Sequence, residues 1–188
     1  MSITVFKAKL KGGGSRGNQF RVSLNFPAFV TGGIDVANSA QFLCEAASLP
    51  GQQISVTQLM YRGRQVKIAG ERNFDNWNIT VLNDTDFSVH NAFEGWMQVI
   101  NNKQENSGLI NPLAYTANVS VEQLDRNGNL LKKYTFVDAW PTAISPIGLD
   151  WGQNDQVERF NVEFAYSWFQ SEMFQGGAAT LSTIAGNL

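Results

Sequence analysis

The residues that could carry catalysis or bind a metal are few and scattered. His90 is the only histidine and Cys44 the only cysteine in 188 residues. A zinc site, a Ser-His-Asp triad and a Cys-His pair each need more of these groups than the chain holds. Because residues 42–46 alternate, we interpret Cys44 as a small packed hydrophobe. We interpret His90 as a neighbour of an apolar helical stripe. The sequence predicts no enzyme and no cofactor.

Two segments resemble ligand-binding loops only loosely. Asp150 and Asp155 enclose a glycine and an asparagine, as in a calcium loop, but the spacing departs from the EF-hand pattern and its terminal glutamate is missing. The segment Lys11-Gly-Gly-Gly-Ser-Arg-Gly-Asn is not followed by Gly-Lys-Ser/Thr, and no strand-then-helix context surrounds it. We therefore interpret that segment as a flexible linker.

The strongest concentration of potential binding residues is a basic and aromatic stretch near residues 52–71. Pro50-Gly51 precedes the stretch, and a short alternation lies between Gly63 and Gly70, which predicts a hairpin-like arm leaving the domain. A polar-basic exterior with a few large apolar residues suits docking better than a core. An ordinary long loop is the alternative. The predicted subunit-contact residues are Tyr61, Arg62, Arg64, Lys67 and Arg72.

Alternating segments elsewhere predict a mainly β fold. The expected strands are residues 20–26, 41–47, 77–82, 117–124, 130–137 and 160–168. Asn127-Gly128 predicts a hairpin turn. Apolar residues recur at helical spacing between Phe87 and Ile100, after the capping run Asn83-Asp84-Thr85-Asp86. We expect two packed antiparallel sheets, a β-sandwich or barrel, with one flanking α-helix.

Length and composition fit one domain. A hydrophobic content of 43% with 12% aromatics is ample for a core. We expect a β domain at residues 20–169, a flexible segment at 1–19 and a flexible tail at 170–188. A net charge of −2 argues against a protein that grips nucleic acid along its own surface. No apolar run reaches membrane-spanning length and no signal peptide is visible, so we expect synthesis in a reducing cytoplasm.

A set of motifs occurs in order along the chain. The central motif is Tyr61-Arg-Gly-Arg, Val66-Lys-Ile-Ala-Gly-Glu-Arg-Asn-Phe-Asp-Asn-Trp and Ile79-Thr-Val-Leu-Asn-Asp. The further segments are Cys44-Glu-Ala-Ala-Ser-Leu-Pro, Ala139-Trp-Pro-Thr, Leu149-Asp-Trp and Tyr166-Ser-Trp. This ordered set, over about Phe20 to Phe169, resembles the tail tube proteins of contractile-tailed bacteriophages. The same fold recurs in type VI secretion tubes.

The resemblance implies a structural virion protein of the tail, made in the host cytoplasm. Six subunits would close a ring whose inner wall is a continuous β-barrel, and the rings would stack into a tube that conducts the genome. The arm would reach a neighbouring subunit or ring, and the helix at 87–100 would lie outside the barrel. The implied partners are further copies, the contractile sheath protein, and baseplate and tube-terminator proteins. DNA would pass without specific binding.

The polar faces of some strands would line such a channel. An acidic or neutral lining lets DNA pass, whereas a basic lining would hold its phosphates. We expect the lining residues to be drawn from Ser23, Asn25, Asn78, Thr80, Ser120, Glu122, Asn161 and Glu163.

Three alternatives stay open. A baseplate or tube-initiator protein would share the fold but nucleate or cap the tube. A phage-derived injection or secretion system would build the same kind of tube for another cargo. A carbohydrate- or ligand-binding β-sandwich would use Trp96, Trp140 or Trp151 as a stacking platform, and core packing is the other explanation of those tryptophans.

Overall fold

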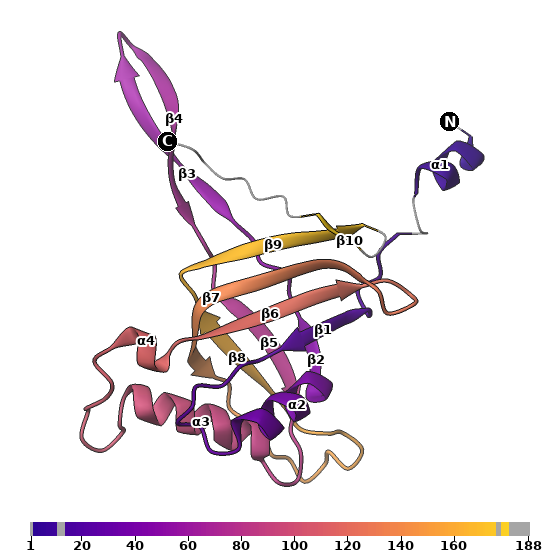
Figure 1. The fold of residues 1–188 in the computed structure, drawn as a ribbon. Coiled ribbons are helices and arrows are strands. Elements are labelled where there is room, and N and C mark those ends of the chain that lie inside the picture. The colour runs from indigo at the N-terminus through magenta and orange to yellow at the C-terminus, as the bar shows by residue number, and fades with distance from the viewer. Residues whose placement is uncertain (1, 11–13, 176–177, 181–188) are drawn as a thin grey trace.

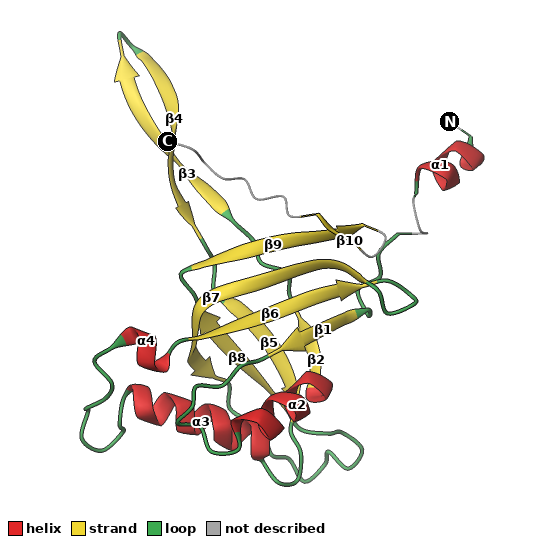
Figure 2. Ribbon diagram, in the orientation of Figure 1, coloured by secondary structure: helices red, strands yellow, loops and turns green. Residues whose placement is uncertain are grey.

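A computed structural model describes residues 2–10, 14–175 and 178–180, and it confirms a mainly β fold (Figures 1 and 2). The described strands are β1 Phe20–Ser23, β2 Cys44–Ala47, β3 Gln53–Tyr61, β4 Arg64–Asn73, β5 Trp77–Leu82, β6 Ala117–Leu124, β7 Leu130–Ile144, β8 Arg159–Ala165, β9 Trp168–Gln175 and β10 Ala178–Thr180. The described helices are α1 Ile3–Lys9, α2 Gly33–Leu43, α3 Ser88–Ile100 and α4 Pro112–Tyr115.

The expectation of two separate packed sheets is wrong, because β7 joins the two halves into one sheet. Eight strands form one antiparallel sheet with the path β1-β6-β7-β8-β5-β2, and β9 joins β7 to β10. The first half of β7 pairs with β6 and β9, whereas its second half pairs with β8. The described strands form no closed barrel. The sheet folds over on itself because one long strand belongs to both halves.

Two backbone features bend β7 where the two halves meet. Asp138 adopts a left-handed φ of 55°. The register with β8 shifts between Pro141 and Ala143, which marks a bulge that bends and twists the strand. Proline lacks the N–H that a ladder needs, and bulges tolerate it. The strand expected at 130–137 therefore continues through Pro141 to Ile144.

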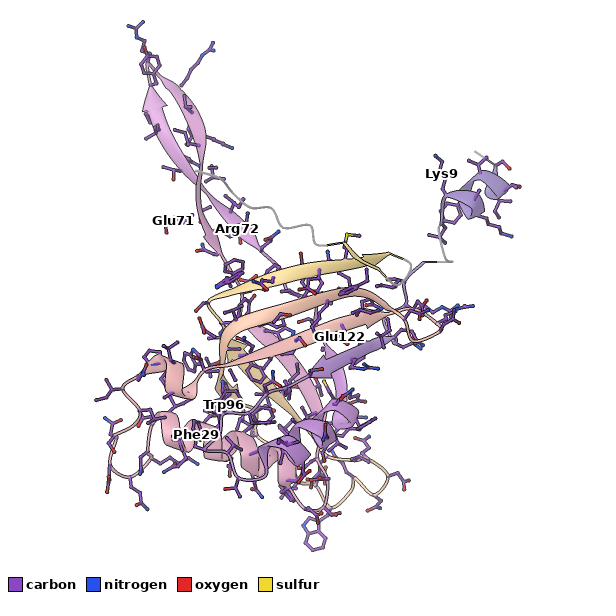
Figure 3. The ribbon with its side chains drawn as sticks, viewed as in Figure 1. Lys9, Phe29, Glu71, Arg72, Trp96 and Glu122 are labelled. Atoms are coloured by element: carbon purple, nitrogen blue, oxygen red, sulfur yellow. The ribbon has the colours of Figure 1, made fainter. Side chains whose placement is uncertain are left out.

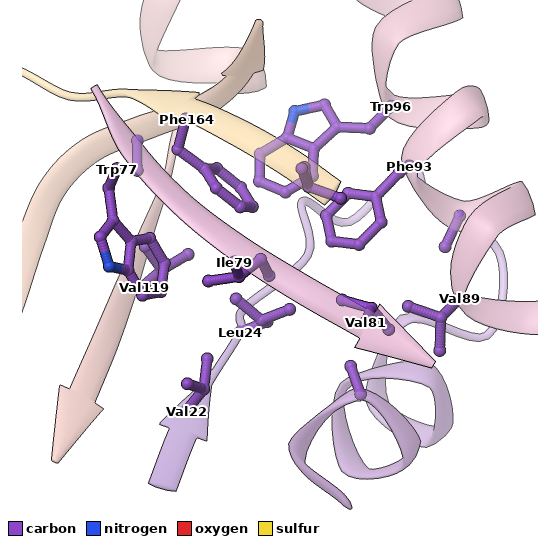
Figure 4. Close-up of a cluster of buried hydrophobic side chains, with 14 of the residues drawn as sticks. Val22, Leu24, Trp77, Ile79, Val81, Val89, Phe93, Trp96, Val119 and Phe164 are labelled. Atoms are coloured by element: carbon purple, nitrogen blue, oxygen red, sulfur yellow. The ribbon is translucent and has the colours of Figure 1, made fainter. Parts of the chain in front are cut away.

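The core lies between the two halves of the sheet and is closed on one side by α3 (Figure 4). β5 contributes Trp77, Ile79 and Val81, which are buried as its alternation predicts. α3 contributes Val89, Phe93 and Trp96 at helical spacing, so the predicted helix is confirmed. The remaining buried apolar side chains are Val22, Leu24, Val30, Ala40, Ala92, Val119, Val121, Phe136, Ala139, Phe160, Val162 and Phe164.

The expectation of a single flanking helix is wrong, because four helices lie in the described residues. α2 occupies residues 33–43, and its end overlaps the start of the strand expected at 41–47. Gly32 enters the helix with φ 72°, a conformation that glycine adopts without strain. The alternating residues 41–43 form its last turn, and the strand begins only at Cys44. The short α1 lies within the segment 1–19, which was expected to be flexible, and it buries no residue.

The single strand expected at 160–168 is divided in two, because β8 ends at Ala165 and β9 begins at Trp168. β9 extends to Gln175, and β10 pairs with it. Of the tail expected at 170–188, residues 176–177 and 181–188 lie outside the described residues.

Candidate assembly surfaces

The predicted arm is a two-stranded hairpin that projects from the domain (Figure 1). Strands β3 and β4 pair with each other, and the described residues contain no further strand beside them. Arg62 and Gly63 form the turn with φ values of 46° and 77°. Two successive positive φ values are typical of a type I′ turn, whose twist suits a tight hairpin. The hairpin prediction is confirmed.

One face of the arm is apolar and exposed. Leu59 pairs with Val66, Thr57 with Ile68, and Tyr61 with Arg64. Because side chains of paired residues lie on the same side, Leu59, Tyr61, Val66 and Ile68 share a face. All four are about half or more exposed in the single chain. An exposed apolar surface of this kind marks an interaction site.

The predicted contact residues all lie on the arm, and their charges are largely unpaired. Among the described residues, Arg62, Arg64 and Lys67 form no ion pair. The Arg62 guanidinium lies 5.5 Å from the centre of the Tyr61 ring. Near the base of the arm, Arg72 donates a hydrogen bond to Gln52 Oε1 at 2.5 Å (Figure 3). The tip therefore presents cations without partners.

The eight candidate channel residues fall into two groups. The first group, on or just after β1 and on β6, is Ser23, Asn25, Ser120 and Glu122; the second, on β5 and β8, is Asn78, Thr80, Asn161 and Glu163. Within the groups, Ser23 faces Ser120 and Asn78 faces Glu163 across strand pairs. The buried side chains of the two sheet halves meet between the groups. The groups therefore lie on opposite outer faces of the folded sheet.

A charge network covers the outer face that carries the first group. Glu122 contacts Lys133 at 3.2 Å and Arg21 at 3.8 Å (Figure 3 labels Glu122). Lys133 also pairs in register with Glu172 of β9. Charges of alternating sign thus form a row across four strands, with the order Arg21, Glu122, Lys133 and Glu172. We name this surface, formed by β1, β6, β7 and β9, the polar face.

The residues that first suggested chemistry have structural surroundings. Burial raises the pKa of the Cys44 thiol to about 12, although a contact from Sγ to Ala46 O partly opposes it. His90 lies edge-on to the rings of Phe87 and Phe160. Within the described ranges, no group of His, Cys, Asp or Glu side chains could hold a metal ion. None of the described helices is long and apolar enough to span a membrane.

The three tryptophans considered as a sugar platform lie in different surroundings. Trp96 is buried and donates to Tyr115 O at 2.7 Å. Trp140 is half-buried and packs edge-on against Tyr115. Trp151 is fully exposed on the loop 145–158. They form no shared stacking surface.

Sequence reasoning missed one surface, formed by the loops 83–87 and 145–158. Asn83 holds them together, since its backbone N–H donates to Glu158 O at 2.9 Å and its Nδ2 donates to Glu158 Oε2 at 2.8 Å. Leu149 and Trp151 on this surface are 82% and 102% exposed. Neither loop contains lysine or arginine, and together they hold the carboxylates Asp84, Asp86, Asp150, Asp155 and Glu158. We name this surface the acidic pole; its charge composition was readable from sequence.

A folded antiparallel sheet with a projecting hairpin, a polar face and no described catalytic cluster defines a self-associating structural domain. Residues 15–172 match the family described as "Phage tail tube protein", and the chain belongs to that family. It is a structural component of the virion tail, as the resemblance implied, and not an enzyme.

Two relatives agree with this assignment, and two solved structures share the fold. Over 167 residues the chain is 30% identical to the tail tube protein of Serratia phage KSP90, covering 88% of this chain and 94% of the relative. It is 25% identical to tail tube protein gp19 of Enterobacteria phage T4, covering 88% and 97%. A chain of the anti-feeding prophage baseplate shares the fold with a TM-score of 0.57 at 18% identity, covering 84% and 94%. A chain of the PVC sheath-tube complex in the extended state gives 0.51 at 16% identity, covering 93% and 99%.

Proposed function

We propose that this chain closes hexameric rings that stack as the inner tube of a contractile tail, a conduit for genome ejection. Membership of the tail tube family supports the tube. The solved complexes with this fold include sheath, baseplate and tube-cap assemblies, which supports sheath, baseplate and terminator proteins as further partners.

The observation that carries the proposal is the arm. Its apolar face is exposed, and its cations form no ion pair in the described part of a single chain. A second copy supplies the missing partner when Tyr61, Arg62, Arg64, Lys67 and Arg72 contact a neighbouring subunit. A contact between two different surfaces of identical chains generates rings or filaments rather than closed dimers.

The polar face is the channel wall in this proposal. The sheet half that carries it ends at β1 and at β10, and edge strands can pair with further chains to form a continuous wall. Its row of two cations and two carboxylates is neutral overall, so it does not hold phosphates strongly. Ser23, Asn25 and Glu122 then line the channel, whereas Ser120 lies on the same face but is buried in the single chain. Asn78, Thr80, Asn161 and Glu163 lie on the opposite face and point away from it.

Negative-stain electron microscopy of the purified protein across concentrations tests the proposal. We expect hollow tubes or hexameric rings for the native protein, and the loss of tubes in the variant Arg62→Glu/Arg64→Glu. The matched control Lys103→Glu/Arg126→Glu makes the same change of charge away from the arm and retains assembly. A monomer at every concentration would refute the proposal. Single rings that never lengthen would favour the baseplate or initiator role.

A further inference from the structure

We propose that the arm of one copy docks on the acidic pole of a copy in the next ring. This inference rests on the proposed stacking of rings and names the surface that receives the arm. The occupant is a second copy of this chain. The contact joins an apolar and basic hairpin to an apolar and acidic loop.

The arm supplies one half of a complementary pair. Residues 52–73 contain four cations, Arg62, Arg64, Lys67 and Arg72, and a single carboxylate, Glu71. Leu59, Tyr61, Val66 and Ile68 form the exposed apolar face. Arg64 shares that face as the partner of Tyr61, whereas Lys67 pairs with Gln58 on the opposite face. Such a surface requires a partner that offers both apolar area and negative charge.

The acidic pole offers both. Leu149 and Trp151 are exposed on the loop 145–158, Asp150 lies between them in the sequence, and Asp155 follows in the same loop. Asp150 Oδ1 accepts from Gly152 N at 2.9 Å, which shapes the loop around the tryptophan. A hollow of about 400 Å³ lies within the loop, with Leu149, Trp151 and Glu158 in its lining. In the described part of the chain, no ion pair involves any of the five carboxylates of this pole.

The two surfaces lie at opposite ends of the molecule (Figure 1). The arm therefore does not reach the acidic pole of its own chain, whereas a copy stacked beyond it presents that pole toward the tip. A nine-residue strand such as β3 spans about 30 Å at ~3.3 Å per residue, so the tip contacts a neighbour well outside its own domain. Because the contact is head-to-tail, each ring leaves a free arm and a free pole, and stacking can continue.

In the contact, Tyr61 and Leu59 pack against Trp151 and Leu149, and the tip cations face Asp150 and Asp155. Aromatic anchors of this kind dominate the energy of interfaces. The charged pairs select the correct end of the next subunit and exclude arm-to-arm contacts, since like charges repel. Screening by salt weakens the charged pairs, so ring stacking falls as ionic strength rises.

Charge reversal on each side, and on both sides together, tests the inference by electron microscopy. We expect Asp150→Arg/Asp155→Arg, assembled by itself, to leave single rings that no longer stack. The variant Arg62→Glu/Arg64→Glu, assembled by itself, should do the same. An equimolar mixture of these two variants restores contacts between them, and the combined variant restores tubes. The control Lys103→Glu/Arg126→Glu stacks normally. Unchanged stacking of Asp150→Arg/Asp155→Arg would overturn the inference while leaving the ring proposal intact.

Disulfide trapping gives an independent measurement. The Tyr61→Cys protein and the Trp151→Cys protein are mixed, assembled and oxidised in air. We expect a crosslinked dimer on a non-reducing gel. The native Cys44 thiol does not compete, because burial keeps it protonated. Tyr61→Cys with Ser120→Cys is the control pair and gives no dimer. Tubes that assemble without the Tyr61–Trp151 crosslink would contradict the contact, whereas failure of the native protein to form rings at all would contradict the proposed function instead.

Discussion

The indole of Trp77 stacks on the ring of Phe136, with ring centroids 4.4 Å apart and an interplanar angle of 26°. Trp77 begins β5 and Phe136 lies in the first half of β7, so the contact joins the two halves of the folded sheet. Trp77 Nε1 donates to Ser48 O at 2.7 Å, which satisfies its polar atom inside the core. Ser48 and Trp77 flank the arm in the chain, so this contact also anchors the base of the arm.

Replacing Trp77 with alanine therefore destabilises the domain strongly. We expect a loss of about 3–5 kcal/mol in the free energy of unfolding, because a fully buried aromatic side chain leaves a cavity and its hydrogen-bond partner is orphaned. Urea denaturation of the monomer measures it. Trp151→Ala, at a fully exposed position, is the control and changes stability by less than ~0.5 kcal/mol. Equal effects of the two substitutions would contradict the described core.

Substitution of Gly63 disturbs the arm and leaves the core unchanged. Gly63→Val places a branched side chain at φ 77°, which costs about 1–2 kcal/mol locally. We expect faster hydrogen exchange of backbone amides in β3 and β4 and impaired tube formation, with urea unfolding of the core unaltered. Gly17→Val is the control, since it lies outside the arm and its added side chain meets no atom within 4 Å of the Cβ position. Unchanged exchange in the arm would argue against the tight turn.

Burial of Cys44 makes the stability of the domain depend on alkaline pH. Its thiol has a pKa of about 12 in the folded protein against an ordinary value of 9.0, so the unfolded chain releases its proton first. The contribution of the buried thiol to the free energy of unfolding is complete below about pH 9 and is lost as the pH rises toward 12. Thiol titration with a disulfide reagent at pH 8 should show a protected thiol that reacts fully in urea. Cys44→Ala should flatten the alkaline loss of stability; an identical slope would count against burial of the thiol.

Glu122 keeps the polar face neutral. Glu122→Gln removes the carboxylate between Arg21 and Lys133, so the row keeps two cations and only one carboxylate, Glu172. We expect tubes that still assemble but retain short DNA at low salt, because each uncompensated cation adds a phosphate contact. Co-sedimentation of tubes with a labelled oligonucleotide across salt concentrations measures this. Glu163→Gln, on the opposite outer face, should bind no more DNA than the native tube. Equal DNA retention by the two variants would remove the polar face from the channel.

The sequence predicted those strands and helices whose buried residues recur at the regular spacing of a strand or a helix. Strands β5 and β8 bury every second residue, and α3 buries one stripe, so alternation and helical spacing located them. The β6–β7 hairpin followed from the turn residues Asn127-Gly128. α2 was missed because three of its residues continue an alternating run that belongs to β2. The length of β7 was missed because a bulge accommodates Pro141 within a strand.

The candidate surfaces were predicted less completely, because they depend on which strands pair. Alternation assigned Ser120 and Thr80 to polar faces, but only the pairing shows that these faces lie on opposite sides of the core. Tryptophan is a residue type that often lies in a core, but Trp151 is exposed because it lies on the loop 145–158. The arm was predictable because its glycines, cations and aromatics lie close together in the chain.

The most direct test of the central claim is a helical reconstruction of the assembled protein by electron cryomicroscopy, at a resolution that traces the backbone. The account predicts six subunits per ring, an open channel walled by β1, β6, β7 and β9, and each arm in contact with a neighbouring copy. A channel wall rich in unpaired lysine and arginine, or an assembly without a channel, would contradict it.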